Sequence, residues 1–581
     1  MTMVMKPEEP KGTENIPMRW ASDAIAALLR DLDIPFLALN PGASFRGLLD
    51  SLVNYLGNRD PQILLSLHEE SAVAIATGYA KVTGKPMGVV LHSNVGLMNA
   101  TMTIFNAWCG RVPIIILGAT GPVDAAERRP WIDWIHTAQD QGALVRDYTK
   151  WDDQPASVTA ALESLLRAKQ LSCTEPPGPV YVCLDAALQE RELKGKISMP
   201  DPSRFRPAPP QDPSPGVVRQ AAELLSKAKR PLILPGRVSR KQGHWDERVK
   251  LAEALGAGVL TDIKVGSAFP SKHPLHKAGP CPVVLPERAV KIIRESDVIL
   301  SLDWVDLGGA LKKAWPDEKV SAKVIHCSVD CYIHRGWSKD YQALPPVDVP
   351  ILSPPDIVVS RLLDTIKASG RGDRKMEKVD DKAKDFQFPH QSDDPSISFY
   401  DIAHALKKTK GERKLSLLRL PLRWPEEACD FQGPLDYLGN DGGGAVGSGP
   451  GMAVGAALAL RGSGRIPVAI LGDGDFLMGV TALWTAARYG IPLLIIIANN
   501  RSFGNTRVHQ ERVARERNRP VENKWIGNLI DGPPIDLSAM ARAQGFEAEG
   551  PIENSADLAP ALSRAFGSFD KGRGYLVDVG L

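Results

Sequence analysis

Short runs of β-branched and aliphatic residues alternate along this chain with longer stretches that have the composition of helices. The alternation predicts parallel strands joined by crossover helices, the unit of a doubly wound α/β sheet. Residues 465–500 show it most clearly, because an apolar run, a helical stretch and a second apolar run follow one another. Further strands are predicted at 86–93, 112–119, 230–237, 296–304 and 322–330, and a further helix at 99–110.

Two polar stretches interrupt this pattern. Residues 198–216 are rich in proline, which predicts an extended linker, and residues 367–395 are charged and poor in aliphatic side chains. They divide the 581 residues into blocks at 15–197, 217–366 and 396–581. We therefore expect three doubly wound parallel-sheet domains.

Blocks one and three share a local plan. Pro113 follows Leu91 by 22 positions and Pro492 follows Leu471 by 21, and a polar turn and a helix lie between them in both cases. Ligands of such sheets bind at the carboxyl ends of the strands. Two similar sheets that face each other would bind one elongated ligand across their interface. Generic α/β similarity is the alternative explanation.

Composition narrows the class of protein. The chain has 70 Lys and Arg against 68 Asp and Glu, so its charge gives no reason to expect nucleic acid or a membrane surface as a partner. The apolar runs are too short to span a bilayer, and the first residues contain no apolar segment of a secretory signal. Seven cysteines without a CxxC pair indicate reduced thiols and a cytoplasmic protein.

The sharpest motif is Gly472-Asp473-Gly474, followed after 24 residues by Asn499-Asn500. The first element ends a predicted strand and opens a turn, and the second ends the next strand, so both lie at one edge of the sheet. Glycines allow backbone N–H groups to approach an anion. The oxygens of Asp473 and Asn500, with a loop carbonyl for which Ser502 is the candidate, suit Mg²⁺ or Ca²⁺. The pattern predicts a metal-bridged diphosphate site.

This motif and its surroundings resemble the cofactor motif of thiamine diphosphate (ThDP) dependent enzymes, in the branch of acetolactate synthases, benzoylformate decarboxylases and related 2-oxo acid decarboxylases. The resemblance covers nearly the whole chain. It implies ThDP and Mg²⁺ as cofactors and pyrimidine-binding, central and diphosphate-binding domains in chain order. It also implies a site between block one of one subunit and block three of another, hence at least a homodimer and often a homotetramer.

The resemblance also implies a glutamate in block one that exchanges a proton with the pyrimidine ring of the cofactor. The segment from His68 to Ala80 matches the family signature, and counting nine positions back from Gly78 selects Glu69. A buried carboxyl group with a raised pKa would suit that exchange. Glu70 is interpreted as a helix-start residue favoured by the helix dipole.

Three positions bear on the substrate. Asn40-Pro41-Gly42-Ala43 resembles a family turn that ends in serine, so Ala43 lacks the hydroxyl, and Ser44 replaces it only if the turn shifts. Leu91-His92-Ser93 matches the Leu-His-Ser of benzoylformate decarboxylase, which makes His92 the candidate acid/base; a histidine bonded within the turn is the alternative. His136 is interpreted as structural. The family's second histidine is missing from residues 303–306.

The diphosphate-binding block departs from the family at several points. The family bends ThDP over an aliphatic residue in a glycine-rich turn, here Gly444 and Val446, and valine is smaller than usual. Arg419 and Arg423 stand where Ser or Thr usually contacts phosphate, and they either bind it or are solvated. Asp475 follows the Gly-Asp-Gly turn, where its charge repels diphosphate unless a metal or an arginine compensates.

An arginine-rich segment follows Asn500. It is either an exposed helix with salt bridges or a lid that meets an anionic substrate; its members are Arg507, Arg512, Arg515, Arg517 and Arg519, with Glu511 and Glu516 among them.

The predicted function is a ThDP- and Mg²⁺-dependent lyase that decarboxylates a 2-oxo acid to an aldehyde. A carboligase similar to acetolactate synthase, a transferase, is the alternative within the family, and a non-catalytic nucleotide-binding or scaffold protein is the alternative outside it. Retention of Glu69, Asp473 and Asn500 together argues against the latter. A dinucleotide dehydrogenase is disfavoured because no GxGxxG follows a block-one strand. Block two contains no phosphate-binding loop, so the sequence gives no indication of FAD.

Overall fold

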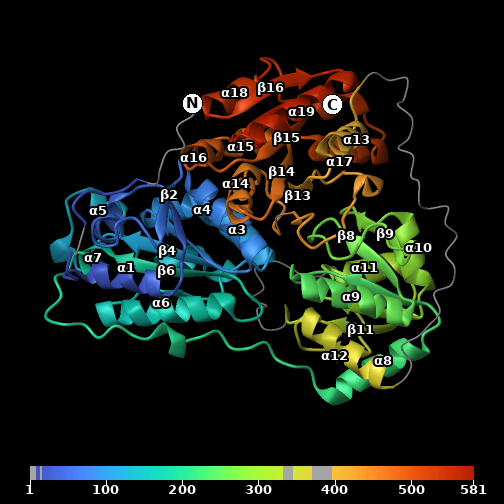
Figure 1. The fold of residues 1–581 in the computed structure, drawn as a ribbon, viewed down its shortest axis with the longest axis horizontal. Coiled ribbons are helices and arrows are strands. Elements are labelled where there is room, and N and C mark those ends of the chain that lie inside the picture. Colours follow the sequence, from blue (N-terminus) through green and yellow to red (C-terminus); the bar gives the residue numbers. More distant parts are fainter. Residues whose placement is uncertain (1–7, 14–15, 331–343, 370–395, 441) are drawn as a thin grey trace.

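Three parallel sheets form the protein, as the sequence predicts. The computed structural model describes residues 8–13, 16–330, 344–369, 396–440 and 442–581. In Figure 1 the first domain is blue to teal, the central domain green to yellow, and the third domain orange to red. The polar stretch predicted at 367–395 lies largely outside the described residues. The exact domain boundaries stay a prediction.

The first domain holds a six-stranded sheet of order β2-β1-β3-β4-β6-β5. Its strands are β1 Phe36–Leu39, β2 Gln62–Leu65, β3 Met87–Leu91, β4 Ile114–Thr120, β5 Asp152–Asp153 and β6 Pro179–Asp185. Its helices are α1 Ala21–Asp31, α2 Arg46–Asp50, α3 Glu69–Thr83, α4 Ser93–Cys109, α5 Ile132–Ile135, α6 Val158–Cys173 and α7 Ala186–Gln189. Alternate β4 residues face α1 and α6 on one side and α3 and α4 on the other.

The central domain has a six-stranded sheet of order β12-β11-β10-β7-β8-β9. Its strands are β7 Pro231–Pro235, β8 Gly258–Asp262, β9 His276–Cys281, β10 Val298–Leu302, β11 Lys323–Cys327 and β12 Val349–Ile351. Helices α8 Pro215–Lys227, α9 Gln242–Leu255 and α12 Pro355–Ala368 cover one face, and α10 Glu287–Glu295 and α11 Leu307–Ala314 cover the other.

The third domain has a five-stranded sheet of order β13-β14-β15-β17-β16. Its strands are β13 Lys414–Arg419, β14 Arg465–Gly472, β15 Leu494–Asn499, β16 Glu547–Ile552 and β17 Tyr575–Gly580. Its helices are α13 Phe399–Lys410, α14 Gly449–Ala459, α15 Asp473–Gly479, α16 Ala482–Arg488, α17 Gly504–Glu516, α18 Leu537–Ala543 and α19 Ser555–Phe569. Helices α13 and α19 pack on one face, and α14, α16 and α18 pack on the other.

The first and third domains share one hydrophobic core. It joins apolar residues of α3 and α4 to those of α14 and β15. Helices α3 and α14 cross so closely that a Cβ on Gly78 would lie 2.0 Å from the carbonyl oxygen of Met452. A larger residue cannot enter this crossing without moving a backbone, so the glycine fixes how the two sheets face each other. Figure 1 shows α3 and α14 together at this junction.

Two predicted elements differ in extent from the structure. The helix predicted over 99–110 begins earlier, at Ser93. The prediction left out its first residues because Asn and Ser are weak helix formers and were assigned to a turn. The turn predicted at Gly472-Asp473-Gly474 is the first turn of α15. Among the described residues, no helix is both long and apolar enough to cross a membrane.

Candidate active site

The diphosphate motif lies at the carboxyl edge of the third sheet. Strands β14 and β15 pair so that Gly472 stands opposite Ala498. The residues that follow these two strands therefore meet at one edge. Asp473 is buried and opens α15, where the positive end of a helix favours an anion.

The three predicted metal ligands lie together. The backbone N–H of Ser502 is 3.0 Å from Asp473 Oδ2 and 3.0 Å from Asn500 Oδ1. The Ser502 hydroxyl donates to the same Asn500 oxygen at 3.0 Å. Burial raises the pKa of Asp473, while backbone N–H donors oppose the shift. A buried carboxylate beside an amide oxygen is a donor set that fits Mg²⁺, because a cation would stabilise the charge that burial disfavours.

A cavity of about 270 Å³ opens beside Asp473. Asn499 and Asp578 also line it, and Asn499 Nδ2 donates to Asp578 Oδ1 at 3.0 Å. Burial raises the pKa of Asp578 to about 6 and the charge of Asp473 adds to the shift, although the hydrogen bond from Asn499 opposes it. Asn499, the first residue of the Asn-Asn pair, thus holds a second acidic group at the same cavity as Asp473.

Arg419 compensates Asp475, the acidic residue that departs from the family pattern. Its Nε lies 3.1 Å from Asp475 Oδ2. Asp475 Oδ1 accepts the N–H groups of Gly447 and Gly449 at 2.6 and 3.2 Å. Arg423, the other predicted phosphate contact, is exposed. Asp475 therefore holds the start of α14 in place, and its charge is balanced within the protein.

The glycine-rich turn presents an apolar side chain to solvent. Gly444 and Gly447 have φ angles of 70° and 104°, values that glycine adopts without strain. Val446, between them, has 47% of its surface exposed. An apolar residue held outward by a turn of this kind can support a flat ring.

Glu69 is buried as the first residue of α3, with both carboxylate oxygens hydrogen-bonded. Asn40 Nδ2 donates to Oε1 and Asn99 Nδ2 donates to Oε2, both at 3.1 Å. Gly96 leaves room for the carboxylate, because a Cβ there would lie 3.1 Å from Oε1. Sequence reasoning missed Asn99, whose only signal is that it follows Gly96 by three positions on the same helix face.

Glu70 points elsewhere. Its Oε1 lies toward the glycine-rich turn, 3.0 Å from where a Cβ on Gly447 would stand. The two neighbouring glutamates therefore have different surroundings. Glu69 faces amides of the first domain, and Glu70 faces the third domain.

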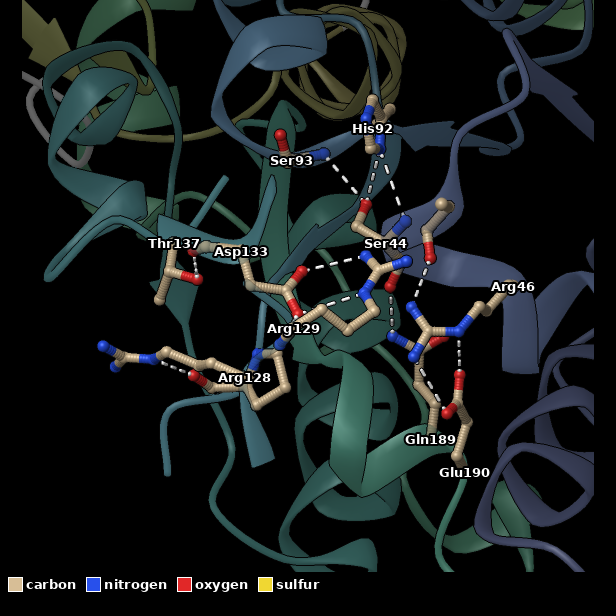
Figure 2. A network of polar contacts seen from close by, with 12 residues as sticks. Ser44, Arg46, His92, Ser93, Arg128, Arg129, Asp133, Thr137, Gln189 and Glu190 are labelled. Carbon is tan, nitrogen blue, oxygen red and sulfur yellow. Dashed lines mark hydrogen bonds and ion pairs between the residues drawn. The ribbon is translucent and has the colours of Figure 1, made fainter. Parts of the chain in front are cut away.

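His92 precedes α4 and contacts Ser44. Its Nδ1 lies 2.8 Å from Ser44 Oγ (Figure 2). The ring fills the space over Gly42, where a Cβ would lie 2.1 Å from Cγ of His92. The predicted position of the missing serine, Ala43, is exposed, while Ser44 is buried against the histidine.

The His92 ring also has an imidazole neighbour. The centroids of His92 and His136 are 4.8 Å apart and the planes are nearly perpendicular, so the histidine interpreted as structural lies beside the candidate acid/base. Burial lowers the pKa of His92, and His136 and Arg129 lower it further, while the charge of Glu69 opposes them. These surroundings favour the neutral form of His92.

The segment where the family's second histidine is expected has another role in this chain. Asp303 is buried and pairs with Arg111 of the first domain at 2.5 Å, and Arg111 also pairs with Asp330. Burial lowers the pKa of Arg111 to about 10. The residues after β10 thus form a buried ionic contact between the first and central domains.

The arginine-rich segment forms α17, none of whose residues is buried. Arg515 pairs with Glu511 at 2.6 Å and Arg512 with Glu516 at 3.8 Å. The guanidinium of Arg507 lies 4.2 Å from the ring centroid of Trp525. These contacts are those of an exposed helix with salt bridges; a role as a lid stays a prediction.

Comparisons with known proteins match this architecture along the chain. Family models for thiamine pyrophosphate enzymes match in order: the N-terminal TPP binding domain at residues 19–145, the central domain at 218–362 and the C-terminal TPP binding domain at 422–579.

Similar curated proteins span almost the same length. The acetolactate synthase large subunit of Corynebacterium glutamicum is 27% identical over 574 residues, covering 96% of this chain and 86% of that protein. Benzoylformate decarboxylase of Pseudomonas aeruginosa is 24% identical over 516 residues, covering 84% and 87%. In fold, the chain is similar to benzoylformate decarboxylase from Polynucleobacter necessarius, with a TM-score of 0.78, 21% identity, and coverage of 97% and 99%.

Three family domains in the expected order, the sheets that correspond to them and relatives that span most of the chain agree with one another. The chain belongs to the thiamine pyrophosphate enzyme family and is a ThDP-dependent enzyme of the acetolactate synthase and decarboxylase group.

Proposed function

We propose that this enzyme binds ThDP with Mg²⁺ and decarboxylates a 2-oxo acid to an aldehyde. The observation that carries the proposal is the cluster in the first domain. The buried Glu69 accepts hydrogen bonds from two amides, and His92 lies close enough for the charge of Glu69 to affect its pKa. The relative from Pseudomonas aeruginosa named benzoylformate decarboxylase supports the choice of reaction.

The chain provides the groups that would hold the cofactor. Asp473, Asn500 and the Ser502 carbonyl are the proposed ligands for Mg²⁺. Gly472 and Gly444 leave space for the diphosphate and the ring, which Val446 supports, whereas the space at Gly474 is filled by Phe503, whose Cε1 lies 2.8 Å from where a Cβ would stand. When bound, ThDP supplies a carbon nucleophile for the 2-oxo carbon and takes up the electrons released with carbon dioxide.

The side chains of the first domain act on protons and charge. Glu69 exchanges a proton with the pyrimidine nitrogen N1′, and the amides of Asn40 and Asn99 keep the carboxyl group in place. His92 provides a hydrogen bond to an oxygen of the substrate. Preorganised groups in a buried site stabilise developing charge without reorganising at each turnover.

A carboligase is the second candidate. The acetolactate synthase relative matches 96% of this chain, a larger share than the benzoylformate decarboxylase covers. Both reactions begin with loss of carbon dioxide from a 2-oxo acid. They differ in whether a proton or a second carbonyl compound then takes the carbon that remains.

The test is a screen of purified enzyme with ThDP and Mg²⁺ over aliphatic and aromatic 2-oxo acids. Aldehyde equal to the carbon dioxide released supports the decarboxylase, whereas a hydroxyketone product identifies the carboligase. No carbon dioxide from any 2-oxo acid, with bound ThDP verified, would overturn the proposal.

We further propose at least a homodimer, and a homotetramer as its extension. Apolar side chains on one face of α4 are exposed: Val95 at 41%, Met98 at 55% and Met102 at 39%. The face adjoins the helix turn that contacts Glu69, so a second chain that covers it would also close the site. Sedimentation that finds a fully active monomer would contradict the shared site.

A further inference from the structure

Three polar contacts connect Ser44 with His92 and with Ser93, the residue after it. The hydroxyl oxygen of Ser44 lies 2.8 Å from His92 Nδ1, and the backbone N–H of Ser93 donates to that oxygen at 3.1 Å. The backbone N–H of Ser44 also points at His92 Nδ1, at 3.4 Å. Figure 2 shows these three contacts meeting beneath the imidazole.

The direction of each bond follows from which groups can donate. A backbone N–H is only a donor, so Nδ1 must accept from Ser44. A nitrogen that accepts carries no proton to give, so the Ser44 hydroxyl donates to Nδ1 while its oxygen accepts the N–H of Ser93. With Nδ1 accepting, a neutral imidazole carries its proton on Nε2.

We propose that Ser44 is a positioning residue that holds His92 as the neutral Nε2–H tautomer, so that His92 acts on the substrate as a fixed hydrogen-bond donor and not as a proton shuttle. This inference rests on the proposed function for its consequence in catalysis, but the tautomer itself does not depend on any substrate.

The surroundings of His92 act in the same direction. A proton on Nδ1 would face the N–H of Ser44, and a second positive charge would stand near Arg129. His136 packs edge-on at 4.8 Å and Phe45 lies at 6.5 Å, so the ring has little room to turn over. Glu69 on α3 is the charged neighbour that favours imidazolium.

A fixed tautomer changes the role of the histidine. The Nε2–H can stabilise negative charge that develops on a substrate oxygen, and no proton needs to leave the ring. Ser44 directly follows Ala43, the position where the family pattern has serine. This chain thus has no hydroxyl at position 43, and the hydroxyl at position 44 contacts the histidine.

The test observes the ring nitrogens directly. The full-length enzyme is labelled with ¹⁵N-histidine, and the His92 signals are assigned by their loss in His92→Gln. Ser44→Ala removes the hydroxyl, and Ser44→Thr keeps it. Ala43→Ser is the matched control, because it adds a hydroxyl at the exposed neighbouring position.

Wild type, Ser44→Thr and Ala43→Ser should show a bare Nδ1 and a protonated Nε2. Ser44→Ala should show a mixture of tautomers and should form imidazolium at a higher pH than wild type does. Its kcat/KM on an accepted 2-oxo acid should fall about fivefold, mainly in kcat, since one hydrogen bond contributes about 1 kcal/mol.

A protonated Nδ1 in wild type, or an unchanged tautomer in Ser44→Ala, would overturn the proposal. If the enzyme accepts no 2-oxo acid but the nitrogen signals behave as expected, the proposed function fails while the assignment of the tautomer stands.

Discussion

Arg419 Nε lies 3.1 Å from Asp475 Oδ2, and the two side chains are only 11% and 6% exposed. Each residue alone departs from the pattern of its family, since one adds a positive charge and the other a negative charge near the diphosphate site. Together they form a neutral pair. The carboxylate also accepts the N–H groups of Gly447 and Gly449, so the pair connects β13 to the start of α14.

This pair makes a prediction about stability. Arg419→Met should leave the buried Asp475 carboxylate without its guanidinium counter-ion and lower the free energy of unfolding by about 3–5 kcal/mol. Asp475→Asn keeps an acceptor for the two N–H groups, so the double variant should regain much of the loss. Urea denaturation of the four proteins completes the cycle. A loss in the double variant equal to the sum of the losses in the two single variants would show that the pair is not coupled.

Sequence predicted the parts of the site that are local. Asp473 and Asn500 follow two neighbouring strands, and strand ends of a parallel sheet meet at one edge. The pairs Ser44–His92 and Arg111–Asp303 join residues 48 and 192 positions apart, and no spacing in the sequence indicates them. The role of Asp475 was open for the same reason, because its partner is set by how β13 lies beside β14.

A second prediction concerns the metal. Asp473→Ala removes the one predicted ligand that carries a full charge, so ThDP affinity in the presence of Mg²⁺ should fall about tenfold to a hundredfold. Calorimetric titration with and without a chelator measures it. Asp531→Ala removes an exposed carboxylate from the same domain and should change little. If neither the Asp473 substitution nor the chelator changed the affinity for ThDP, the assignment of Mg²⁺ to this site would be wrong.

A third prediction is an acid sensitivity of the central domain. Burial lowers the pKa of His276 from 6.5 to about 4. Its Nδ1 donates to the Ser271 carbonyl at 3.0 Å, and its Nε2 accepts from Thr261 at 2.9 Å. In the unfolded chain His276 takes up a proton near pH 6.5, whereas in the folded protein it does so only near pH 4. Stability from this residue is therefore complete above pH 6.5 and is lost as the pH falls toward 4, by about 3 kcal/mol.

His276→Asn isolates this effect, because asparagine keeps a donor toward Ser271 and does not titrate. The variant should be less stable than wild type at pH 7.5 and should lose less stability between pH 6.5 and 4.5. Thermal melting between pH 4.5 and pH 7.5 measures both. Parallel pH dependence in the two proteins would assign the acid sensitivity to other groups.

A fourth prediction separates chemistry from binding at Glu69. Glu69→Gln keeps the size of the side chain and one acceptor oxygen for Asn40 or Asn99, but it cannot exchange a proton with N1′. The metal and diphosphate ligands belong to the third domain, so ThDP should remain bound. Turnover should fall by about 10²- to 10⁴-fold, the usual contribution of a general acid or base.

The direct measurement is hydrogen–deuterium exchange at C2 of bound ThDP, read by acid quench and proton NMR. Exchange should be fast in wild type and slow in Glu69→Gln at equal occupancy. Glu70→Gln is the matched control, because Glu70 faces the glycine-rich turn and not the amides of Asn40 and Asn99, and it should exchange as wild type does. Slow exchange in Glu70→Gln with fast exchange in Glu69→Gln would assign the proton exchange with N1′ to Glu70 instead of Glu69. Fast exchange in both would mean that neither carboxylate activates the cofactor, and a non-catalytic role would then gain weight.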